Sequence, residues 1–227
     1  MKSAFAITMI LISIIGSDLF AAENKKTEAD NLVDKSRIVI YEMMHGRDNE
    51  VPTDLIKQAS GIAIIPGMIK AGFVIGGSYG KGTVVGYRQG AWTGPAFIKM
   101  GAGSLGFQIG AESVDLILVI VGQKTMDAFM KQKFKLGADV ALVAGPVGAQ
   151  ASAASNITFK GGIYSYSRAK GAFAGVSLEG AGIATQEDLN KAYYESTDNP
   201  HVILSGKVSP PKSGQELHSV LDEYRHK

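Results

Sequence analysis

The sequence predicts an α+β fold with a mainly antiparallel, strongly curved, glycine-rich sheet that is barrel-like or sandwich-like. Of the 28 glycines, only Gly16, Gly46, Gly206 and Gly214 lie outside residues 61–182, where the others alternate with apolar β-forming residues. Glycine inside strands marks bulges, tight corners or the close approach of another backbone. Strand-like segments also outnumber helical ones and do not alternate with them, which disfavours a parallel sheet of βαβ units.

Residues 1–21 have the features of a secretory signal peptide. Lys2 precedes an apolar run from Ala4 to Ile15, and the polar part of the chain begins at Glu23. Because the apolar run is shorter than the ~17 residues of a membrane span, we expect cleavage after Ala21, with an uncleaved anchor as the alternative. The chain has no cysteine, so it lacks the residue that anchors a bacterial lipoprotein. We therefore expect a periplasmic or secreted protein.

Two helices are predicted in residues 22–60, and one-sided apolar spacing identifies the first. Residues 24–46 carry both acidic and basic side chains on their polar side, whereas membrane-surface helices favour lysine and arginine there. Packing on the sheet is therefore preferred to a membrane-surface role. Pro52 opens a second helix that reaches Ser60. The apolar residues at three- and four-residue intervals in the first helix are Ala29, Leu32, Val33, Val39, Ile40, Met43 and Met44.

The glycine-rich core is predicted at residues 61–196, followed by a polar tail at 197–227. Turns are expected at Gly80–Gly82 and Gly90–Gly94. Helices are expected at Gln123–Lys133, at Thr185–Tyr194 and, in the tail, at 215–226, after a loop at 198–214. The predicted strands lie near 61–66, 71–79, 82–89, 95–100, 103–112, 114–122, 138–145, 147–155, 157–168 and 171–180.

Charge is distributed unevenly, although the net charge of the whole chain is only +2. Residues 61–182 contain 11 lysines and arginines against five acidic residues. A mildly basic core between acidic flanks is compatible with an anionic partner. We expect no nucleic-acid partner, because the chain has no dense lysine and arginine stripe and no motif in which aromatic and basic residues alternate.

The motifs of catalytic and cofactor-binding proteins are weak in this chain. Gly101-Ala-Gly103-Ser-Leu-Gly106 matches the dinucleotide pattern, but a strand-like segment follows it instead of the helix that would hold a pyrophosphate. The four histidines lie outside the core, so neither a zinc motif nor a Ser/His/Asp site is predicted there. Glu112 and Asp115 are interpreted as polar residues of a predicted turn. We expect no cofactor, no metal and no enzymatic activity.

Seven blocks of the core follow one another with the spacing of a known domain. The first block contains Ile64-Ile65-Pro66, Lys70-Ala-Gly-Phe73, Gly76-Gly77 and Gly80-Lys-Gly82. The other six are Trp92-Thr-Gly-Pro95-Ala-Phe97, Gly103-Ser-Leu-Gly106-Phe-Gln108-Ile-Gly110, Asp115-Leu-Ile-Leu-Val119, Lys135-Leu-Gly137-Ala-Asp139, Ala144-Gly-Pro146-Val-Gly148 and Tyr164-Ser-Tyr166-Ser-Arg168-Ala-Lys170-Gly171-Ala-Phe173-Ala-Gly175-Val-Ser177-Leu-Glu179-Gly180. Over about residues 30–196 the chain resembles the SYLF domain family, which has many secreted bacterial members. The absence of an anchoring cysteine departs from its bacterial lipoproteins.

The resemblance implies a lipid-binding module without established catalytic residues. Eukaryotic members bind acidic phospholipids, and a yeast member binds and bundles actin filaments. We therefore expect an exported protein that contacts a phospholipid or membrane surface through its basic core. The alternative is a structural or interaction protein of the cell envelope with a protein or filament partner; neither hypothesis fixes the oligomeric state. The residues expected near a lipid headgroup are Lys70, Arg88, Lys99, Arg168 and Lys170.

Overall fold

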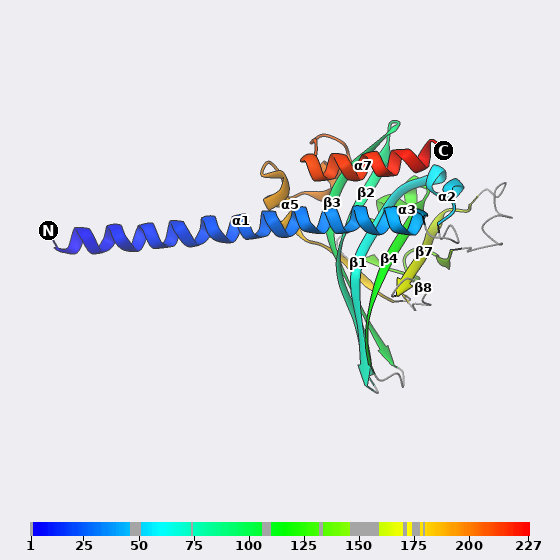
Figure 1. The fold of residues 1–227 in the computed structure, drawn as a ribbon, viewed down its shortest axis with the longest axis horizontal. Coiled ribbons are helices and arrows are strands. Elements are labelled where there is room, and N and C mark those ends of the chain that lie inside the picture. Colours follow the sequence, from blue (N-terminus) through cyan, green and yellow to red (C-terminus); the bar gives the residue numbers. More distant parts are fainter. Residues whose placement is uncertain are drawn as a thin grey trace.

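The protein is built around one nine-stranded sheet (Figure 1). The computed structural model describes residues 2–45, 51–73, 75–105, 110–131, 134–145, 159–169, 172–173, 178 and 180–227, with side chains described from residue 22 onward outside a few strand ends. The strands are β1 (Ala59–Phe73), β2 (Ile75–Arg88), β3 (Ala91–Leu105), β4 (Gly110–Val121), β5 (Phe134–Lys135), β6 (Leu142–Ala144), β7 (Gly162–Ala169), β8 (Ala172–Phe173) and β9 (Gly182–Thr185).

The sheet confirms the predicted fold class. The strand order is β5-β9-β3-β2-β1-β4-β7-β6, and β8 pairs with β7. All of these pairs are antiparallel except β6 with β7. The register between β1 and both of its neighbours shifts between Ile64 and Ile69, where Gly67 has a φ of 58°. Such a bulge bends a strand and increases its twist, which accounts for part of the strong curvature.

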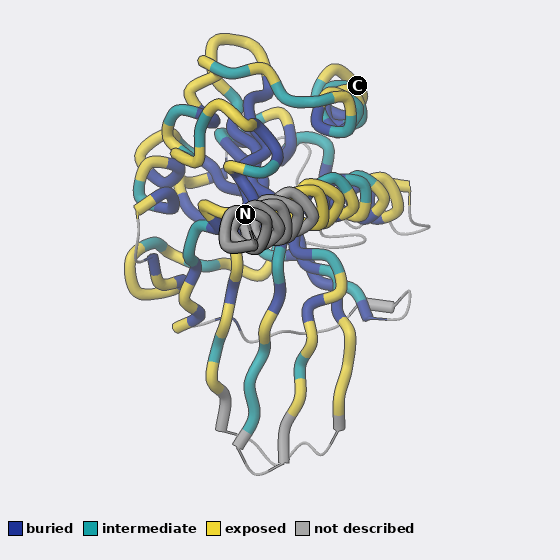
Figure 2. The backbone as a smooth tube through the Cα atoms, turned by 90° about the vertical axis from the view of Figure 1, so that its left-hand side faces the viewer, coloured by how far each residue is buried: buried dark blue, intermediate teal, exposed yellow. Residues whose placement is uncertain are grey.

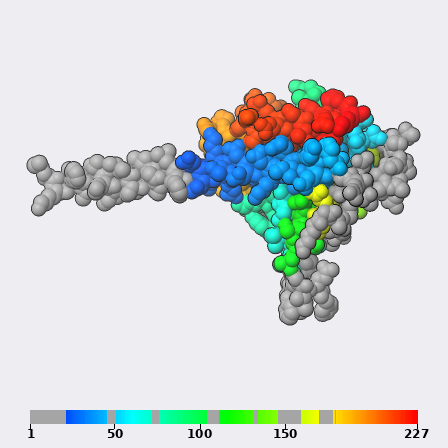
Figure 3. Space-filling model, viewed as in Figure 1, coloured from blue at the N-terminus to red at the C-terminus, as the bar shows by residue number. Residues whose placement is uncertain are grey.

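Helices cover both faces of the inner half of the sheet. The helix α1 (Lys2–His45) lies beside α7 (Lys212–Arg225) across one face, as Figures 1 and 3 show. The helix α5 (Glu187–Tyr194) packs on the same face, since the rings of Phe97 and Tyr193 lie 5.2 Å apart. On the other face lies α3 (Gln123–Phe129), whose Met126 fills the space above Gly61. The short α2 (Thr53–Gln58) leads into β1.

The inner face of α1 holds the apolar residues expected from the helical spacing. All seven of them are buried: Ala29, Leu32, Val33, Val39, Ile40, Met43 and Met44. One buried polar contact lies among them, because the Thr83 hydroxyl donates to Ser36 Oγ at 3.0 Å and Ser36 in turn donates to the Leu32 carbonyl at 2.8 Å. This chain of hydrogen bonds fixes α1 over β2, since a buried hydroxyl without a partner is costly.

Several predicted strand boundaries were wrong, and close packing of glycine explains the clearest case. Gly80 and Gly82 lie inside β2 and form no turn. A Cβ atom on Gly80 would lie 2.5 Å from Ile65 Cγ2, and one on Gly82 would lie inside the contact radius of the Ile64 carbonyl oxygen. Because glycine has no Cβ atom, β1 can pack closely against β2 at these two positions beside its bulge. The predicted strands 71–79 and 103–112 are each divided between two strands, because β1 ends at Phe73 and β3 at Leu105.

The C-terminal region is more ordered than the predicted loop at 198–214. It contains α6 (Pro200–Leu204), which begins with an Asn-Pro pair. The Asn199 side chain accepts a hydrogen bond from the His201 amide at 2.9 Å, as a helix cap does. Ile203 and Leu204 are buried in the core. The strand β9 was also missed, while α3, α5 and α7 confirm the helices predicted in their places.

Two further sequence expectations concern the rest of the chain. The predicted strand 147–155 lies outside the described residues, as does most of the strand predicted at 171–180. Across the described part of the chain, no helix combines the length and the apolar character that crossing a membrane requires.

His218 of α7 makes stability depend on pH. Burial is the main cause that lowers the pKa of this imidazole, although Asp222 opposes the shift, and its Nε2 atom has no hydrogen-bond partner among the described residues. The unfolded chain therefore binds the proton more readily, so the folded state loses stability as pH falls below about 6.5.

We expect His218→Gln to remove this part of the pH dependence. Urea unfolding of both proteins at pH 7.5, 6.0 and 5.0 measures it: the stability of the native sequence relative to His218→Gln should decline as the pH falls. A difference that stays constant over this range would contradict the assignment.

Candidate binding surface

Four of the five basic residues predicted to contact lipid belong to the described residues, and they lie in separate parts of the sheet. Lys70 is in the outer part of β1, where its partner in β2 is Ser78, and Arg88 is the last residue of β2. About 33 Å of strand therefore separates the two basic positions, at ~3.3 Å per residue. Lys99 lies in β3 and Arg168 in β7. The structure does not bring these residues together around one apolar recess.

Arg168 is engaged inside the protein. Its side chain is only 12% exposed, and it forms ion pairs with Glu42 of α1 and, at 3.8 Å, with Asp115 of β4. Asp115 also accepts a hydrogen bond from the Gly67 amide at 2.8 Å. Arg168 thus links α1, β4 and β7 beside the bulge of β1, and this position favours a structural role. Lys170 lies outside the described residues.

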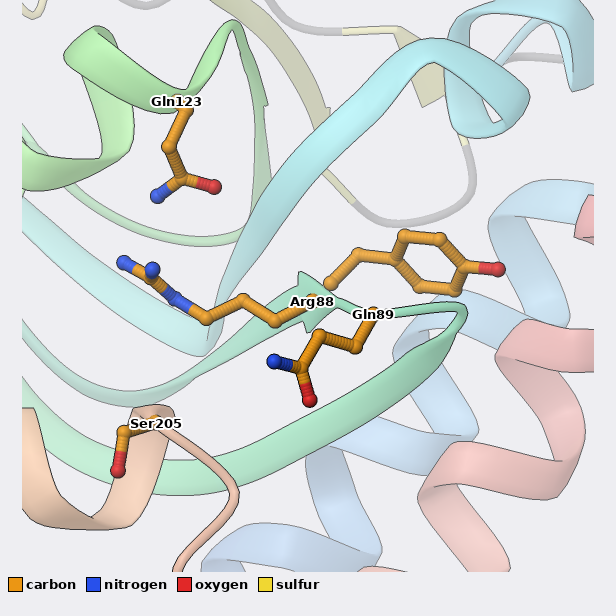
Figure 4. A pocket seen from close by; sticks show the side chains of 5 residues that line it. Arg88, Gln89, Gln123 and Ser205 are labelled. Atoms are coloured by element: carbon orange, nitrogen blue, oxygen red, sulfur yellow. The ribbon is translucent and has the colours of Figure 1, made fainter.

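Arg88 lines an open polar pocket of about 430 Å³ (Figure 4). Its guanidinium donates to Asp127 Oδ1 at 2.9 Å, and the Gln123 amide donates to the same oxygen at 3.0 Å. Because a carboxylate of α3 balances the charge of Arg88, the pocket has little positive charge to attract an anion. Its other lining residues are Tyr87, Gln89 and Ser205.

Lys99 lies directly opposite Lys81 of β2 in the register. Like charges in this position are unfavourable, and Glu28 of α1 offsets them through a 2.5 Å contact with Lys81 Nζ. This hydrogen bond is the main cause that raises the pKa of Lys81. Lys99 is exposed and forms no ion pair within the described part of the chain, so its charge remains available to a partner.

The outer ends of β1 to β4 extend beyond the helical cover as a four-stranded arm. We define the arm as residues 69–73, 75–79, 101–105 and 110–113, which are all joined in one register. Figure 2 shows these four strands leaving the body of the protein, and the arm residues whose burial is described are mostly exposed or half-buried. β9 accompanies β3 only as far as Gly101, and β7 accompanies β4 only to Val114. Beyond Gly101 and Val114, both edges of the arm therefore have no strand partner among the described residues.

One face of the arm continues the sheet face that α1 covers further inward. Ile69 and Tyr79 lie opposite each other on this face and are 50% and 52% exposed. The next row contains only alanine and glycine, with Ala71 between Gly77 and Ala111. The opposite face carries Lys70, Ser78, Ala102 and Glu112 in one row. The arm is thus a thin plate with one mainly apolar face, large enough to contact a surface rather than to enclose a small molecule.

The sequence interpretation missed the arm, although the chain carries a signal for it. The turn expected at Gly80–Gly82 would have ended β2 early, so the length of the hairpins was underestimated. The signal is the lack of charge: residues 71–80 and 100–111 contain no lysine, arginine, aspartate or glutamate.

The described side chains also contain no group of three or more His, Cys, Asp or Glu residues arranged to hold a metal ion.

Comparison with known families gives a match over residues 101–224. The matching family is Ysc84, described as "Las17-binding protein actin regulator". The match begins in the outer part of β3 and ends in α7, so it includes half of the arm and the elements that follow it.

Comparison with curated proteins gives relatives in yeast and animals. "LAS seventeen-binding protein 3" of Saccharomyces cerevisiae is 35% identical over 181 residues, which is 78% of this chain and 39% of the relative. "SH3 domain-containing YSC84-like protein 1" of Xenopus laevis is 31% identical over 186 residues, covering 81% of this chain and 55% of the relative. The human protein of the same name is 30% identical over 185 residues, covering 81% and 54%. The chain thus spans about two fifths to just over half of these relatives.

Proposed function

Because the chain belongs to the Ysc84 family of SYLF domains, described as a binding protein and regulator, we propose that it is a non-catalytic binding module. Its proposed partner is a membrane surface that contains acidic phospholipids. The observation that carries this proposal is the arm, in which four long strands leave the helical cover and expose both of their faces. Exposed apolar side chains on a plate favour contact with an extended surface.

The charges near the arm support an acidic membrane as the partner. Lys70 in the arm and Lys99 at its base form no ion pair within the described residues, whereas Arg88 and Arg168 are both paired. A lysine near an anionic membrane surface contributes about 1 kcal/mol to binding. We therefore assign the headgroup contact to Lys70 and Lys99, leaving the other predicted residues out of it. The signal peptide predicted at residues 1–21 supports an exported protein that meets this membrane outside the cytoplasm.

Liposome flotation tests the proposal. We expect binding to vesicles of phosphatidylcholine with a third of phosphatidylglycerol, and weaker binding to phosphatidylcholine alone. The double variant Lys70→Gln/Lys99→Gln should bind the anionic vesicles about 30-fold more weakly, since two contacts of about 1 kcal/mol are lost.

Lys207→Gln/Lys212→Gln is the matched control, because it removes the same charge at two exposed positions near α6 and α7. The control should bind at least ten-fold more tightly than the arm variant. Equal losses in the two variants, or no binding of the native sequence to either vesicle, would overturn the proposal.

A protein partner is the second candidate, and the family description favours it. The flat face with Ile69 and Tyr79 has the exposed aromatic and aliphatic character of a protein interface. Cosedimentation with actin filaments in the absence of lipid tests this candidate. Binding to filaments that Tyr79→Ser abolishes, with no flotation on either vesicle, would establish it in place of the membrane.

A further inference from the structure

Two lysines face each other at the base of the arm, on the side of the sheet that α1 covers. Lys81 of β2 and Lys99 of β3 are partners in the antiparallel register, which places their Cβ atoms about 4.5–5.5 Å apart. They lie one row inward of Tyr79 and share its face, because side chains two positions apart on a strand point the same way. Like charges directly opposite each other destabilise a sheet. Chains keep such an unfavourable local choice mainly at functional sites, so the pair is a candidate anion site.

Glu28 of α1 is the counter-ion of this pair, and it neutralises only half of the charge. Its carboxylate lies 2.5 Å from Lys81 Nζ, whereas Lys99 is exposed and forms no ion pair within the described residues. The pKa of Lys81 is raised mainly by its hydrogen bond to Glu28 and slightly by the charge of Asp188 on α5. Asp188 is itself paired with Lys25 at 3.2 Å. The two ammonium groups and the Glu28 carboxylate together therefore leave one positive charge without a partner.

The Glu28 contact is easy to exchange, because this part of α1 lies on the surface. Residues 22–28 are all exposed, and Ala29 is the first buried residue of α1 among those with described side chains. The side chains of Lys81 and Glu28 are 39% and 44% exposed, and exposed ion pairs contribute little to stability. An anion that binds Lys81 more strongly can therefore replace the Glu28 carboxylate while the apolar face of α1 holds the helix in place.

Charge selects the kind of anion that gains most at this pair. A phosphodiester carries one negative charge, as the Glu28 carboxylate does, so replacing one with the other gains little. A phosphomonoester carries about 1.5–2 negative charges at pH 7 and has three acceptor oxygens. One such group can accept hydrogen bonds from both ammonium groups and balance their two charges. Lysine binds phosphate as a point charge, so two flexible lysines suffice for this contact.

We propose that Lys81 and Lys99 together bind a phosphomonoester, and that Glu28 is the internal counter-ion which this group displaces. The inference rests on the membrane binding proposed above and adds to it the chemistry of the headgroup and a second lysine beside Lys99. The phosphomonoester belongs either to a lipid headgroup, as in phosphatidic acid, or to a soluble molecule, because the two lysines contact only the phosphate. The experiments below distinguish these two sources.

Flotation on two kinds of vesicle tests the preference for a phosphomonoester. Phosphatidic acid carries a monoester and phosphatidylglycerol a diester, and their fractions in phosphatidylcholine are adjusted to the same zeta potential. We expect the native sequence to bind the phosphatidic acid vesicles about five-fold more tightly, the contribution of one further lysine. Lys81→Gln should reduce this ratio to less than two-fold. Lys57→Gln should leave the ratio unchanged, because Lys57 is a lysine of similar exposure, 41%, in an ion pair with Asp54 of α2.

Removal of the counter-ion gives a second test. In Glu28→Gln the Lys81 ammonium is free before any ligand binds, so binding to the phosphatidylglycerol vesicles should become about five-fold tighter. Adding Lys81→Gln to this variant should abolish the gain. Glu195→Gln is the matched control, because Glu195 is an exposed carboxylate that accepts from Lys26 of α1 at 2.6 Å, and its removal should change binding less than two-fold. Circular dichroism and thermal unfolding confirm that the variants fold.

Titration with glycerol 3-phosphate in the absence of vesicles decides the source of the phosphate. Binding that Lys81→Gln abolishes would assign the site to soluble phosphomonoesters, whereas a preference for phosphatidic acid without such binding assigns it to the headgroup. Equal binding to both vesicles together with no titration signal would overturn the phosphomonoester site, while the membrane-binding function stands. Equal gains in Glu28→Gln and Glu195→Gln would overturn the role of Glu28. If the native sequence floats on neither vesicle, the membrane-binding function fails, and only Lys81-dependent titration would preserve the site.

Discussion

Replacing Gly82 by alanine is expected to destabilise the protein by about 3 kcal/mol or more, because the new methyl group would collide with backbone. A Cβ atom at this position falls inside the contact radius of the Ile64 carbonyl oxygen and lies 2.9 Å from Ile65 Cγ1. The backbone of a paired strand cannot move aside as a flexible side chain can. The loss of stability should therefore reach or exceed the upper end of the range that overpacked substitutions cause. For a domain of this size the melting temperature should fall by roughly 6–12 °C.

Gly103→Ala is the matched control in the neighbouring strand. Nothing lies within 4 Å of a Cβ atom at Gly103, and its φ is not positive. Alanine also reduces the conformational entropy of the unfolded chain. The free energy of unfolding of this variant should therefore equal that of the native sequence or exceed it by up to about 1 kcal/mol. Thermal and urea unfolding of the two variants measure the contrast. Similar melting temperatures would show that β1 and β2 can separate at the bulge, contrary to the packing described above.

Replacing Arg168 by methionine is expected to cost about 2 kcal/mol of stability. The substitution keeps the apolar stem but removes the charge that pairs with Glu42 and Asp115. Removal of one partner from a buried ion pair costs 3–5 kcal/mol, and exposure of the Glu42 side chain reduces that figure through solvent screening. The bulge at Gly67 should loosen as well, because Asp115 also holds its amide.

Arg88→Met provides the comparison, since Arg88 forms a similar ion pair at a more exposed place. Its side chain and that of Asp127 are 40% and 59% exposed, and pairs of this kind contribute at most about 1 kcal/mol. In urea unfolding, Arg168→Met should therefore lose more stability than Arg88→Met. In liposome flotation, the two variants should bind the anionic vesicles equally well. A selective loss of lipid binding in Arg168→Met, without a loss of stability, would restore the lipid contact predicted for this residue from the sequence.

The candidate site was only partly predictable, and the reason is visible in its lysines and arginines. All the basic residues named from the sequence belong to the same basic core, and sequence alone gives them equal weight. Their partners come from distant parts of the chain: Glu42 reaches Arg168 across 126 positions and Asp127 reaches Arg88 across 39. Only these contacts separate the paired residues from Lys70 and Lys99.

The strand boundaries were harder to predict than the fold class for a similar reason. A glycine can mark a turn or a close approach, and local sequence does not decide between the two. Gly80 and Gly82 provide the close approach because β1 bulges over them. The Asn-Pro pair at the start of α6 was a local signal, but a helix of five residues becomes stable only when Ile203 and Leu204 enter the core.

The sequence by itself determined the fold class, the amphipathic first helix and the family, because each depends on a local pattern: glycines among β-formers, apolar spacing of three and four residues, and ordered motif blocks. The tertiary structure decided which glycines make room for backbone, which cations are neutralised and where the sheet leaves its helical cover. These properties depend on contacts between residues far apart in the chain, and the arm exists as a surface only because α1, α5 and α7 pack on the inner half of the strands and end before the outer half begins.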